Sequence, residues 1–198
     1  MHVIIATNNA HKVSEIKTAL DFPGWTFETL KEAGIVSDPE ENADSFEGNA
    51  RIKAQAVKAL VPDAAVLADD SGLVVDYLNG APGVYSSRYA GEDGNDAANN
   101  AKLLRELAGV ADDQRTARFV CTLVFISPEG EETVSVGTVE GRIGYKELGE
   151  EGFGYDPLFF PDAFGGERTF AEVSQEEKNS QSHRGNALKG LRNHFMSV

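Results

Sequence analysis

The stretch "TARFVCTLVFI" at residues 116–126 constrains the fold of this chain more than any other segment. Every second residue from Ala117 to Phe125 is apolar, and so are most of the residues between them. A strand with this pattern is buried on both faces and lies in the middle of a covered sheet. "ETVSVGTVEGRI" at 132–143 follows a turn that contains Pro128 and Gly130, which predicts an antiparallel hairpin.

Shorter apolar runs alternate with segments of helical spacing elsewhere. Strands are expected at 2–6, 25–30, 64–68 and 73–78. The first expected helix contains Val13, Ile16 and Leu20, and the second follows the capping pair Asp44 and Glu47. Two more are expected, at 96–108 and through 187–195. These elements predict an α/β protein with a mixed central sheet flanked by helices, in a single domain over residues 1–198.

Composition narrows the function classes. The 198 residues carry a net charge of −14, which argues against a broad basic face for nucleic acid. No apolar run approaches the length of a membrane span, and the N-terminus lacks the features of a signal peptide. Cys121 is the only cysteine, so an intrachain disulfide is impossible and a reducing cytoplasm is expected. No Cys/His cluster suggests zinc.

Two adjacent carboxylates, Asp69 and Asp70, follow the apolar run that ends at Ala68. Because Ser71 and Gly72 come next, we expect the strand to end here and the pair to lie on a turn. Neighbouring carboxylates repel, and a hard cation such as Mg²⁺ would keep both ionised. One would then bind the metal while the other accepts a proton from water. Solvated turn acids, or a cap for the following segment, are the alternative.

Two further segments could bind a phosphate group. "TNNAHK" at 7–12 lies between the first strand and the first helix, where backbone N–H groups, the side chains of Thr7 and Asn9, and Lys12 could bind an anion. An ordinary polar turn explains it equally. In "ENADSFEGNARIKA" at 41–54, Asn49 and Lys53 lie four residues apart and share one helix face. A surface amphipathic helix would also account for that spacing.

Two segments near the C-terminus could bind a base. "GFGYDP" at 152–157 places Phe153 and Tyr155 on a glycine-rich loop beside Asp156, and aromatic faces stack on bases. "KNSQSHRG" at 178–185 sets His183 and Arg184 at the start of the last helix, where the helix dipole disfavours cations. Turn-packing aromatics and a surface cation pair are the alternatives.

Six motifs in this order resemble the inosine/xanthosine triphosphate pyrophosphatases over nearly the whole chain. They are "TNNAHK" (7–12), "SFEGNARIKA" (45–54), "ADDSGL" (68–73), "GAPGVYSSRYAG" (80–91), "GFGYDP" (152–157) and "EKNSQSHRGNAL" (177–188). The resemblance implies Mg²⁺-dependent hydrolysis of ITP, dITP and XTP to the monophosphate and pyrophosphate, which cleanses the nucleotide pool. It also implies a homodimer and an elongated mixed sheet with a substrate cleft between two lobes.

The resemblance also assigns roles to residues. Asp70 would accept the proton and bind the metal, with Asp69 and Lys12 completing the catalytic set. The second metal carboxylate would be Glu40, with Glu41 as the rival assignment. The substrate-binding residues would be Thr7, Asn8, Asn9, Ala10, His11, Lys12, Asn49, Lys53, Ser71, Phe153, Gly154, Tyr155, Asp156, Lys178, His183 and Arg184.

Base selection has a simple chemical basis in this assignment. Hypoxanthine and xanthine carry a 6-oxo acceptor, so donors from His183 and Arg184 would favour them over adenine, whose 6-amino group is a donor.

The chain departs from the family pattern at Asn42-Ala43 and at Gly48, near the second metal carboxylate. The rival functions are a pyrophosphatase for other nucleotides, a nucleotide-binding module without hydrolysis, and a structural interaction protein.

Overall fold

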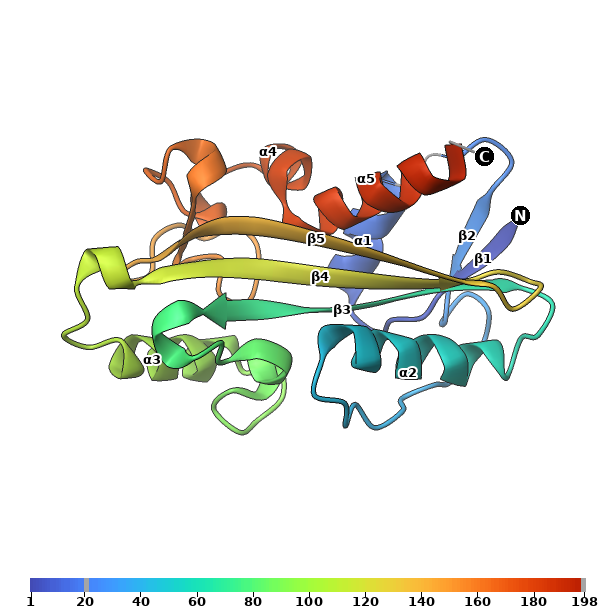
Figure 1. Ribbon diagram of the computed structural model, residues 1–198, viewed down its shortest axis with the longest axis horizontal. Helices are drawn as coiled ribbons and strands as arrows, with labels where there is room; N and C mark the ends of the chain where they lie inside the picture. The colour runs from blue at the N-terminus through green and yellow to red at the C-terminus, as the bar shows by residue number, and fades with distance from the viewer. Residues whose placement is uncertain (20–21, 197–198) are drawn as a thin grey trace. The chain divides into compact units, whose positions relative to one another are not determined.

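The computed structural model describes residues 1–19 and 22–196, so Leu20, expected in the first helix, lies outside the described residues. The described strands are β1 (His2–Ile5), β2 (Thr26–Thr29), β3 (Ala65–Val75), β4 (Thr116–Ile126), β5 (Glu132–Ile143) and β6 (Phe159–Pro161). The α-helices are α1 (Ala10–Ala19), α2 (Phe46–Lys58), α3 (Asp96–Glu106), α4 (Gln175–Gln181) and α5 (His183–Met196) (Figure 1). Short 3₁₀ turns include η2 (Gly83–Arg88) and η5 (Phe170–Glu172).

The strands form one sheet in the order β2-β1-β3-β4-β5-β6. β1 pairs in parallel with β2 and with β3, where Ile4 lies opposite Val66. β5 and β6 pair antiparallel, and the turn between the neighbours β4 and β5 is too short for a parallel crossover. The predicted mixed sheet with flanking helices is therefore confirmed, and so is the hairpin of 116–126 with 132–143.

The chain divides into two compact units. Unit 1 comprises Met1–Asp70, Cys121–Gly137 and Arg184–Val198, and unit 2 comprises Ser71–Val120 and Thr138–His183. β3, β4 and β5 each contribute residues to both units. The reading of residues 1–198 as one domain, like the expected cleft and elongated shape, stays a prediction. Within the described residues, no helix is both long enough and apolar enough to cross a membrane.

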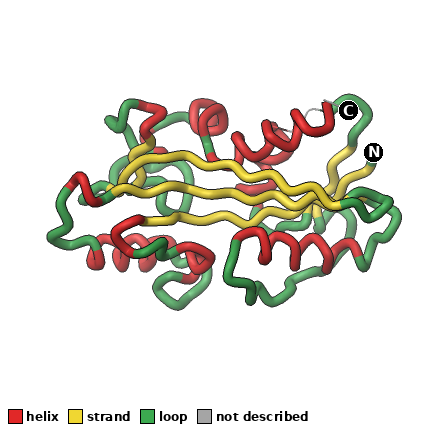
Figure 2. The backbone as a smooth tube through the Cα atoms, viewed as in Figure 1, coloured by secondary structure: helices red, strands yellow, loops and turns green. Residues whose placement is uncertain are grey.

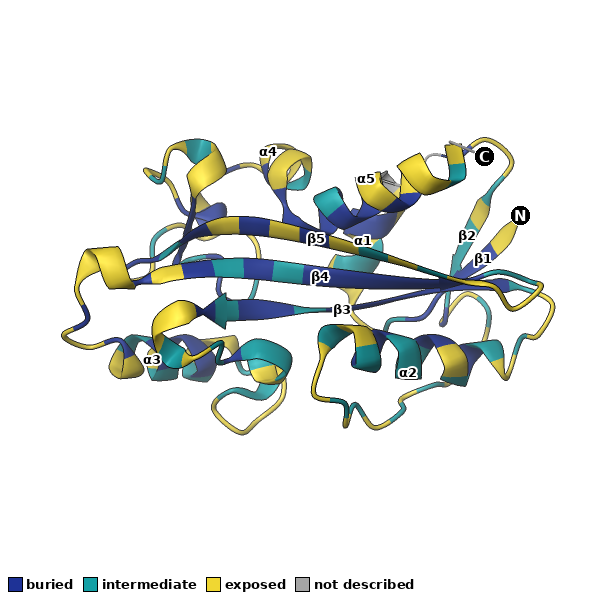
Figure 3. Cartoon of the chain, viewed as in Figure 1, coloured by how far each residue is buried: buried dark blue, intermediate teal, exposed yellow. Residues whose placement is uncertain are grey.

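Unit 1 has apolar clusters on both faces of its strands because successive strand residues point to opposite sides. Val3 and Ile5 of β1 pack in one cluster with residues of α1 and α5, including Ile16 and Leu188. The intervening Ile4 packs in a second cluster with residues of α2. Figure 3 shows β4 buried over most of its length, as expected for a central strand. The strands of unit 1, which carry Asp69 and Asp70, are therefore packed against apolar side chains on both faces.

One apolar cluster is described in unit 2, and it contains residues of α3 and of the parts of β3, β4 and β5 that belong to this unit. Leu103 and Leu107 of α3 pack with Leu73 of β3 and Ile143 of β5. Tyr155, from the loop at 152–157, belongs to the same cluster and is only 4% exposed. The aromatic part of this loop is therefore anchored in the core of unit 2.

One expectation was wrong: the chain does not turn at the acidic pair. β3 runs without interruption from Ala65 to Val75 (Figure 2), and Asp69, Asp70 and Gly72 are ordinary strand residues within it. The strand can continue because both carboxylates meet cationic side chains of the protein, as described below. The predicted strands at 64–68 and 73–78 are thus a single strand that ends at Val75.

The start of α2 also differs from the prediction by one residue. The N-cap is Ser45, whose hydroxyl accepts a hydrogen bond from the Gly48 backbone N–H, and not Asp44. Ser and Asp are comparable N-cap residues, so the sequence alone does not separate neighbouring candidates. Gly48 lies in the first turn, where a Cβ atom would come within 2.6 Å of the Ala43 Cβ. This close approach explains a glycine at a helical position.

Gly141 in β5 is expected to be intolerant of a side chain. A Cβ atom here would overlap the Phe160 carbonyl oxygen on β6 and lie 2.8 Å from Phe159 Cζ. Gly141→Ala should therefore cost about 1–3 kcal/mol of stability, which lowers the melting temperature by roughly 5 °C. Thermal unfolding monitored by circular dichroism measures this. Val136→Thr, an exposed position on the same strand, is the control and should change the melting temperature by less than about 2 °C.

Candidate active site

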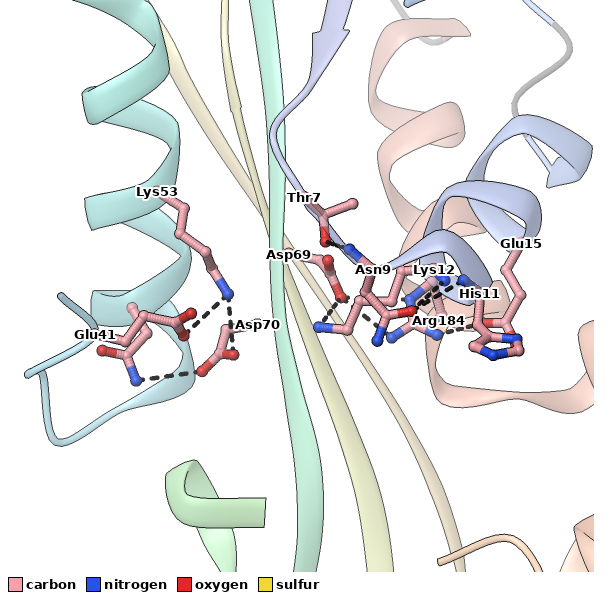
Figure 4. A network of polar contacts seen from close by, with 11 residues as sticks. Thr7, Asn9, His11, Lys12, Glu15, Glu41, Lys53, Asp69, Asp70 and Arg184 are labelled. Atoms are coloured by element: carbon pink, nitrogen blue, oxygen red, sulfur yellow. Dashed lines mark hydrogen bonds and ion pairs between the residues drawn. The ribbon is translucent and has the colours of Figure 1, made fainter. Parts of the chain in front are cut away.

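The two aspartates of β3 lie side by side in sequence but point in opposite directions. Figure 4 shows Asp70 directed towards Lys53 and Glu41, and Asp69 directed towards Lys12 and Arg184. This is the alternation that a continuous strand imposes on consecutive residues. Asp69 is 0% and Asp70 7% exposed, so both carboxylates are buried. Each therefore has its own environment, and every residue of both environments belongs to unit 1.

Asp70 is held by two residues of α2. Lys53 Nζ lies 3.2 Å from Asp70 Oδ1, and Asn49 Nδ2 donates to Asp70 Oδ2 over 3.4 Å. The spacing of Asn49 and Lys53 thus does bring both to one helix face, as predicted. Burial raises the pKa of Asp70, and the nearby Lys53 and Lys12 only partly oppose this. Burial would lower the pKa of Lys53, but its acidic neighbours Asp70, Asp69 and Glu41 raise it, which keeps the ammonium group charged.

The pKa of Asp69 is shifted in the opposite direction to that of Asp70. Its Oδ2 lies 3.0 Å from Lys12 Nζ and 3.2 Å from Arg184 Nη2. Burial alone would raise the pKa of Asp69, but Lys12 and Arg184 outweigh it and hold the pKa well below the usual range. Asp69 is therefore ionised at neutral pH. Its second oxygen, Oδ1, has no hydrogen-bond partner among the described residues.

Glu15 of α1 completes this second environment, and no motif in the sequence indicated it. Arg184 is 1% exposed and forms a close ion pair with Glu15 as well as with Asp69. Burial would lower the pKa of Arg184, but the two carboxylates raise it. Lys12, Asp69, Arg184 and Glu15 therefore form a buried network with two positive and two negative groups, which we call the Asp69 network.

The segment 7–12 forms the start of α1. Asn9 caps the helix, since its Oδ1 accepts from the backbone N–H groups of His11 and Lys12, and Thr7 Oγ1 accepts from the Asn9 N–H. Asn8 Nδ2 donates to the Ser37 carbonyl oxygen. Asn8, Asn9, Ala10 and His11 are all exposed. The predicted anion-binding loop is thus an exposed, side-chain-capped helix start with Lys12 directed to Asp69.

The two glutamates predicted as alternatives for the second metal carboxylate, Glu40 and Glu41, have different surroundings. Glu41 Oε2 lies 3.1 Å from Lys53 Nζ, so Glu41 and Asp70 share one ammonium group. Glu40 is exposed, whereas Glu41 is half-buried. Two carboxylates at one point are a donor set that suits Mg²⁺, which binds one or two protein carboxylates together with substrate phosphates. Among the described residues no group of three or more His, Cys, Asp or Glu side chains could hold a metal by itself.

A second cluster lies in unit 2, around the loop at 152–157, which we call the aromatic loop. Lys178 Nζ contacts Asp156 Oδ2 at 2.6 Å and lies 4.6 Å from the centre of the Phe153 ring. The same Asp156 oxygen accepts from the Phe153 backbone N–H over 2.9 Å. Both Lys178 and Asp156 are buried, and the Tyr155 hydroxyl donates to the Ser86 carbonyl oxygen. The structure therefore brings three of the predicted base-binding residues, Phe153, Asp156 and Lys178, into contact.

The remaining predicted residues divide between the units. His183 belongs to unit 2 and stacks on Phe119, with ring centroids 4.9 Å apart. Arg184, its neighbour in sequence, belongs to unit 1 and to the Asp69 network. Ser71 lies at the start of the unit 2 part of β3 and is half-buried. The two side chains predicted as a base-reading pair thus have different surroundings.

Comparison with known proteins adds a sequence and a structural relationship. The Ham1 family matches residues 3–194. The chain is 49% identical over 200 residues to the dITP/XTP pyrophosphatase of Clostridium perfringens, which covers 98% of this chain and 97% of that relative. It is 50% identical over 189 residues to the dITP/XTP pyrophosphatase of Bacillus subtilis, covering 95% and 93%. The structure of the Staphylococcus aureus Ham1 protein aligns with a TM-score of 0.88 at 41% identity, over 100% of this chain and 99% of that one.

Proposed function

This chain belongs to the Ham1 family, and from that premise we propose that it hydrolyses non-standard purine nucleoside triphosphates, such as dITP, XTP and ITP, to the monophosphate and pyrophosphate. Removal of such nucleotides would keep deaminated purines out of DNA and RNA. The observation that carries the proposal is the placement of Asp70. Its buried carboxylate is oriented by Lys53 and Asn49, and it shares Lys53 with Glu41.

In this proposal Asp70 accepts the proton of the attacking water. Its two oxygens are held by different partners, Lys53 at Oδ1 and Asn49 at Oδ2, so the carboxylate has a fixed orientation. A fixed carboxylate can orient a water molecule and accept its proton as the water attacks phosphorus. Asp69 acts by holding Lys12, whose ammonium group lies 3.0 Å away.

Asp70 and Glu41 are the residues that would hold Mg²⁺, with Glu40 as the less favoured alternative to Glu41 because it is exposed. When bound, the ion supplies positive charge that offsets the charge of the phosphate oxygens. Lys12 and Lys53 supply positive charge from the chain itself, since negative phosphate oxygens otherwise repel a nucleophile. Residues 8–11 at the start of α1 are exposed, so the N-terminal end of this helix, which favours an anion, is open to the triphosphate.

Base recognition is assigned to unit 2. The Phe153 ring offers a face for stacking, and Asp156 and Lys178 form a buried, charge-paired wall behind it. His183 would donate to the 6-oxo group that distinguishes hypoxanthine and xanthine from adenine. The buried partners fix Lys178 and Asp156 in place, so the selectivity for 6-oxo purines rests on a rigid set of donors and acceptors.

Assembly and location complete the proposal. The family resemblance supports a homodimer, and a substrate taken from the free nucleotide pool supports a cytoplasmic enzyme. The single cysteine, Cys121, is buried in unit 1, which is consistent with a chain that does not depend on disulfides. We assign the whole of residues 1–198 to one pyrophosphatase domain whose two compact units carry the phosphate and the base residues, respectively.

Pyrophosphate release tests the proposal directly. We expect Mg²⁺-dependent release from dITP, XTP and ITP, with much slower release from ATP, GTP and dTTP. A chelator should abolish turnover, and added Mg²⁺ should restore it. Strong turnover of ATP would contradict the assignment to 6-oxo purines. Binding of ITP without any release would instead indicate a nucleotide-binding module, because such a module retains the base residues but does not use Asp70.

A further inference from the structure

Two side chains of helix α3 form hydrogen bonds with the backbone of Gly154 in the aromatic loop. The Gly154 backbone N–H donates to Asp96 Oδ2 over 2.7 Å, and the Gly154 carbonyl oxygen accepts from Asn100 Nδ2 over 3.1 Å. Asp96 and Asn100 lie four residues apart, which is about one helical turn, so they project from the same face of α3. Both polar groups of one glycine are thus satisfied by side chains of a helix more than fifty residues earlier in the chain. All three residues belong to unit 2.

Gly154, like Gly152, is a glycine of the aromatic loop. It adopts φ = 63°, in the left-handed region, and glycine has more conformational freedom than any other residue. Its neighbours are held separately: Phe153 N–H donates to Asp156, and the Tyr155 hydroxyl donates to Ser86. Gly154 links these two separately held residues, and the Phe153 ring lies 4.6 Å from Lys178 Nζ.

Asn100 is poorly suited to a purely packing role. It is 3% exposed, and its Oδ1 has no hydrogen-bond partner among the described residues. An unpaired buried oxygen is unfavourable, and an apolar side chain would avoid it. The neighbouring Asn99 is equally buried but is paired at both ends, accepting from Ala90 N and donating to the Ser87 carbonyl oxygen. Asn100 thus carries an unfavourable group while its amide donates to Gly154.

We propose that Asp96 and Asn100 are positioning residues for purine recognition, which fix Gly154 and thereby the Phe153 ring on which the base stacks. This inference rests on the proposed function of the aromatic loop. It adds to that function a part of α3 that the sequence patterns did not single out. Both residues act through Gly154, so their loss should weaken base binding and leave the chemistry at Asp70, in unit 1, unchanged.

Paired measurements on four variants test the proposal. Asp96→Ala and Asn100→Leu each remove one hydrogen bond, and each should raise KM for ITP roughly 5- to 10-fold with kcat within about twofold of wild type. Hydrogen–deuterium exchange of the free protein should be faster at the amides of 152–156. Asp96→Asn keeps an acceptor oxygen without the charge and should restore most of the wild-type KM. Asn99→Leu is the matched control, and it should speed exchange near Ala90 and leave KM unchanged.

Three results would overturn the inference. The first is an unchanged KM in both Asp96→Ala and Asn100→Leu, whatever the exchange data show. The second is unchanged exchange at 152–156, which would mean that α3 does not hold the loop. The third is an equal rise of KM in Asn99→Leu, which would indicate general destabilisation of unit 2. A wild-type protein that hydrolyses no triphosphate is a separate failure, visible before any variant is compared, and it would remove the proposed function together with this role.

Discussion

Asp70→Asn is expected to lower kcat for dITP by roughly 10²- to 10⁴-fold, the range that a lost general base produces. Asparagine has nearly the same shape and can keep a contact with Asn49 or Lys53, but it cannot accept a proton from water at neutral pH. Nucleotide binding should stay measurable, because Lys12, Lys53 and the base residues of unit 2 remain. Pyrophosphate release gives kcat, and calorimetric titration with ITP gives the dissociation constant.

The matched control for this prediction is Asp63→Asn, an exposed acid just before β3 in the same unit. It removes the same charge from the chain and should leave kcat within about twofold of wild type. If Asp70→Asn turned over dITP at the wild-type rate, Asp70 would not be the proton acceptor. If it lost ITP binding altogether, the main contribution of Asp70 would be to binding and not to the chemical step.

Local signals in the sequence predicted the elements that depend on local structure. The stretch 116–126 is β4, residue for residue, because a run that is apolar on both faces can only be buried between two layers. The spacing of Asn49 and Lys53 predicted a shared helix face, and both contact Asp70. The spacing did not indicate that their common partner would be one carboxylate of the acidic pair.

Features that depend on distant partners could not be predicted. The turn that Ser71 and Gly72 predict at Asp69 and Asp70 is absent, because β3 continues through both aspartates. The cations that permit the strand to continue come from Lys12, Lys53 and Arg184, between 17 and 115 positions away along the chain. Glu15 also pairs with a distant residue, because its ion-pair partner Arg184 lies 169 positions further along the chain. No local pattern encodes such pairs.

Arg184→Ala is expected to be among the most destabilising single substitutions in unit 1. The guanidinium is 1% exposed and separates two buried carboxylates, Asp69 and Glu15. Removing one partner of a buried ion pair costs about 3–5 kcal/mol because the remaining charge is left uncompensated. For a chain of this size that corresponds to a fall in melting temperature on the order of 10 °C. Thermal unfolding of the wild type and the variant measures it.

A paired variant separates loss of charge balance from loss of packing. Arg184→Met combined with Glu15→Leu removes one positive and one negative group and leaves Asp69 paired with Lys12. Replacing a buried ion pair with apolar side chains of similar volume is often close to neutral. The double variant should therefore recover most of the stability that Arg184→Met loses alone. A double variant that is less stable than both single variants would contradict the Asp69 network as the reason for the loss.

Arg184→Ala also tests the base-reading role that the family resemblance gives to Arg184. That role predicts a smaller ratio of kcat/KM for ITP over ATP in Arg184→Ala. The ratio is independent of how much of the enzyme is folded, because both substrates meet the same population, so the loss of stability does not obscure it. A fall in melting temperature with an unchanged ratio would assign Arg184 to the Asp69 network alone. Selection of 6-oxo purines would then rest on unit 2, with His183 as the donor to the base.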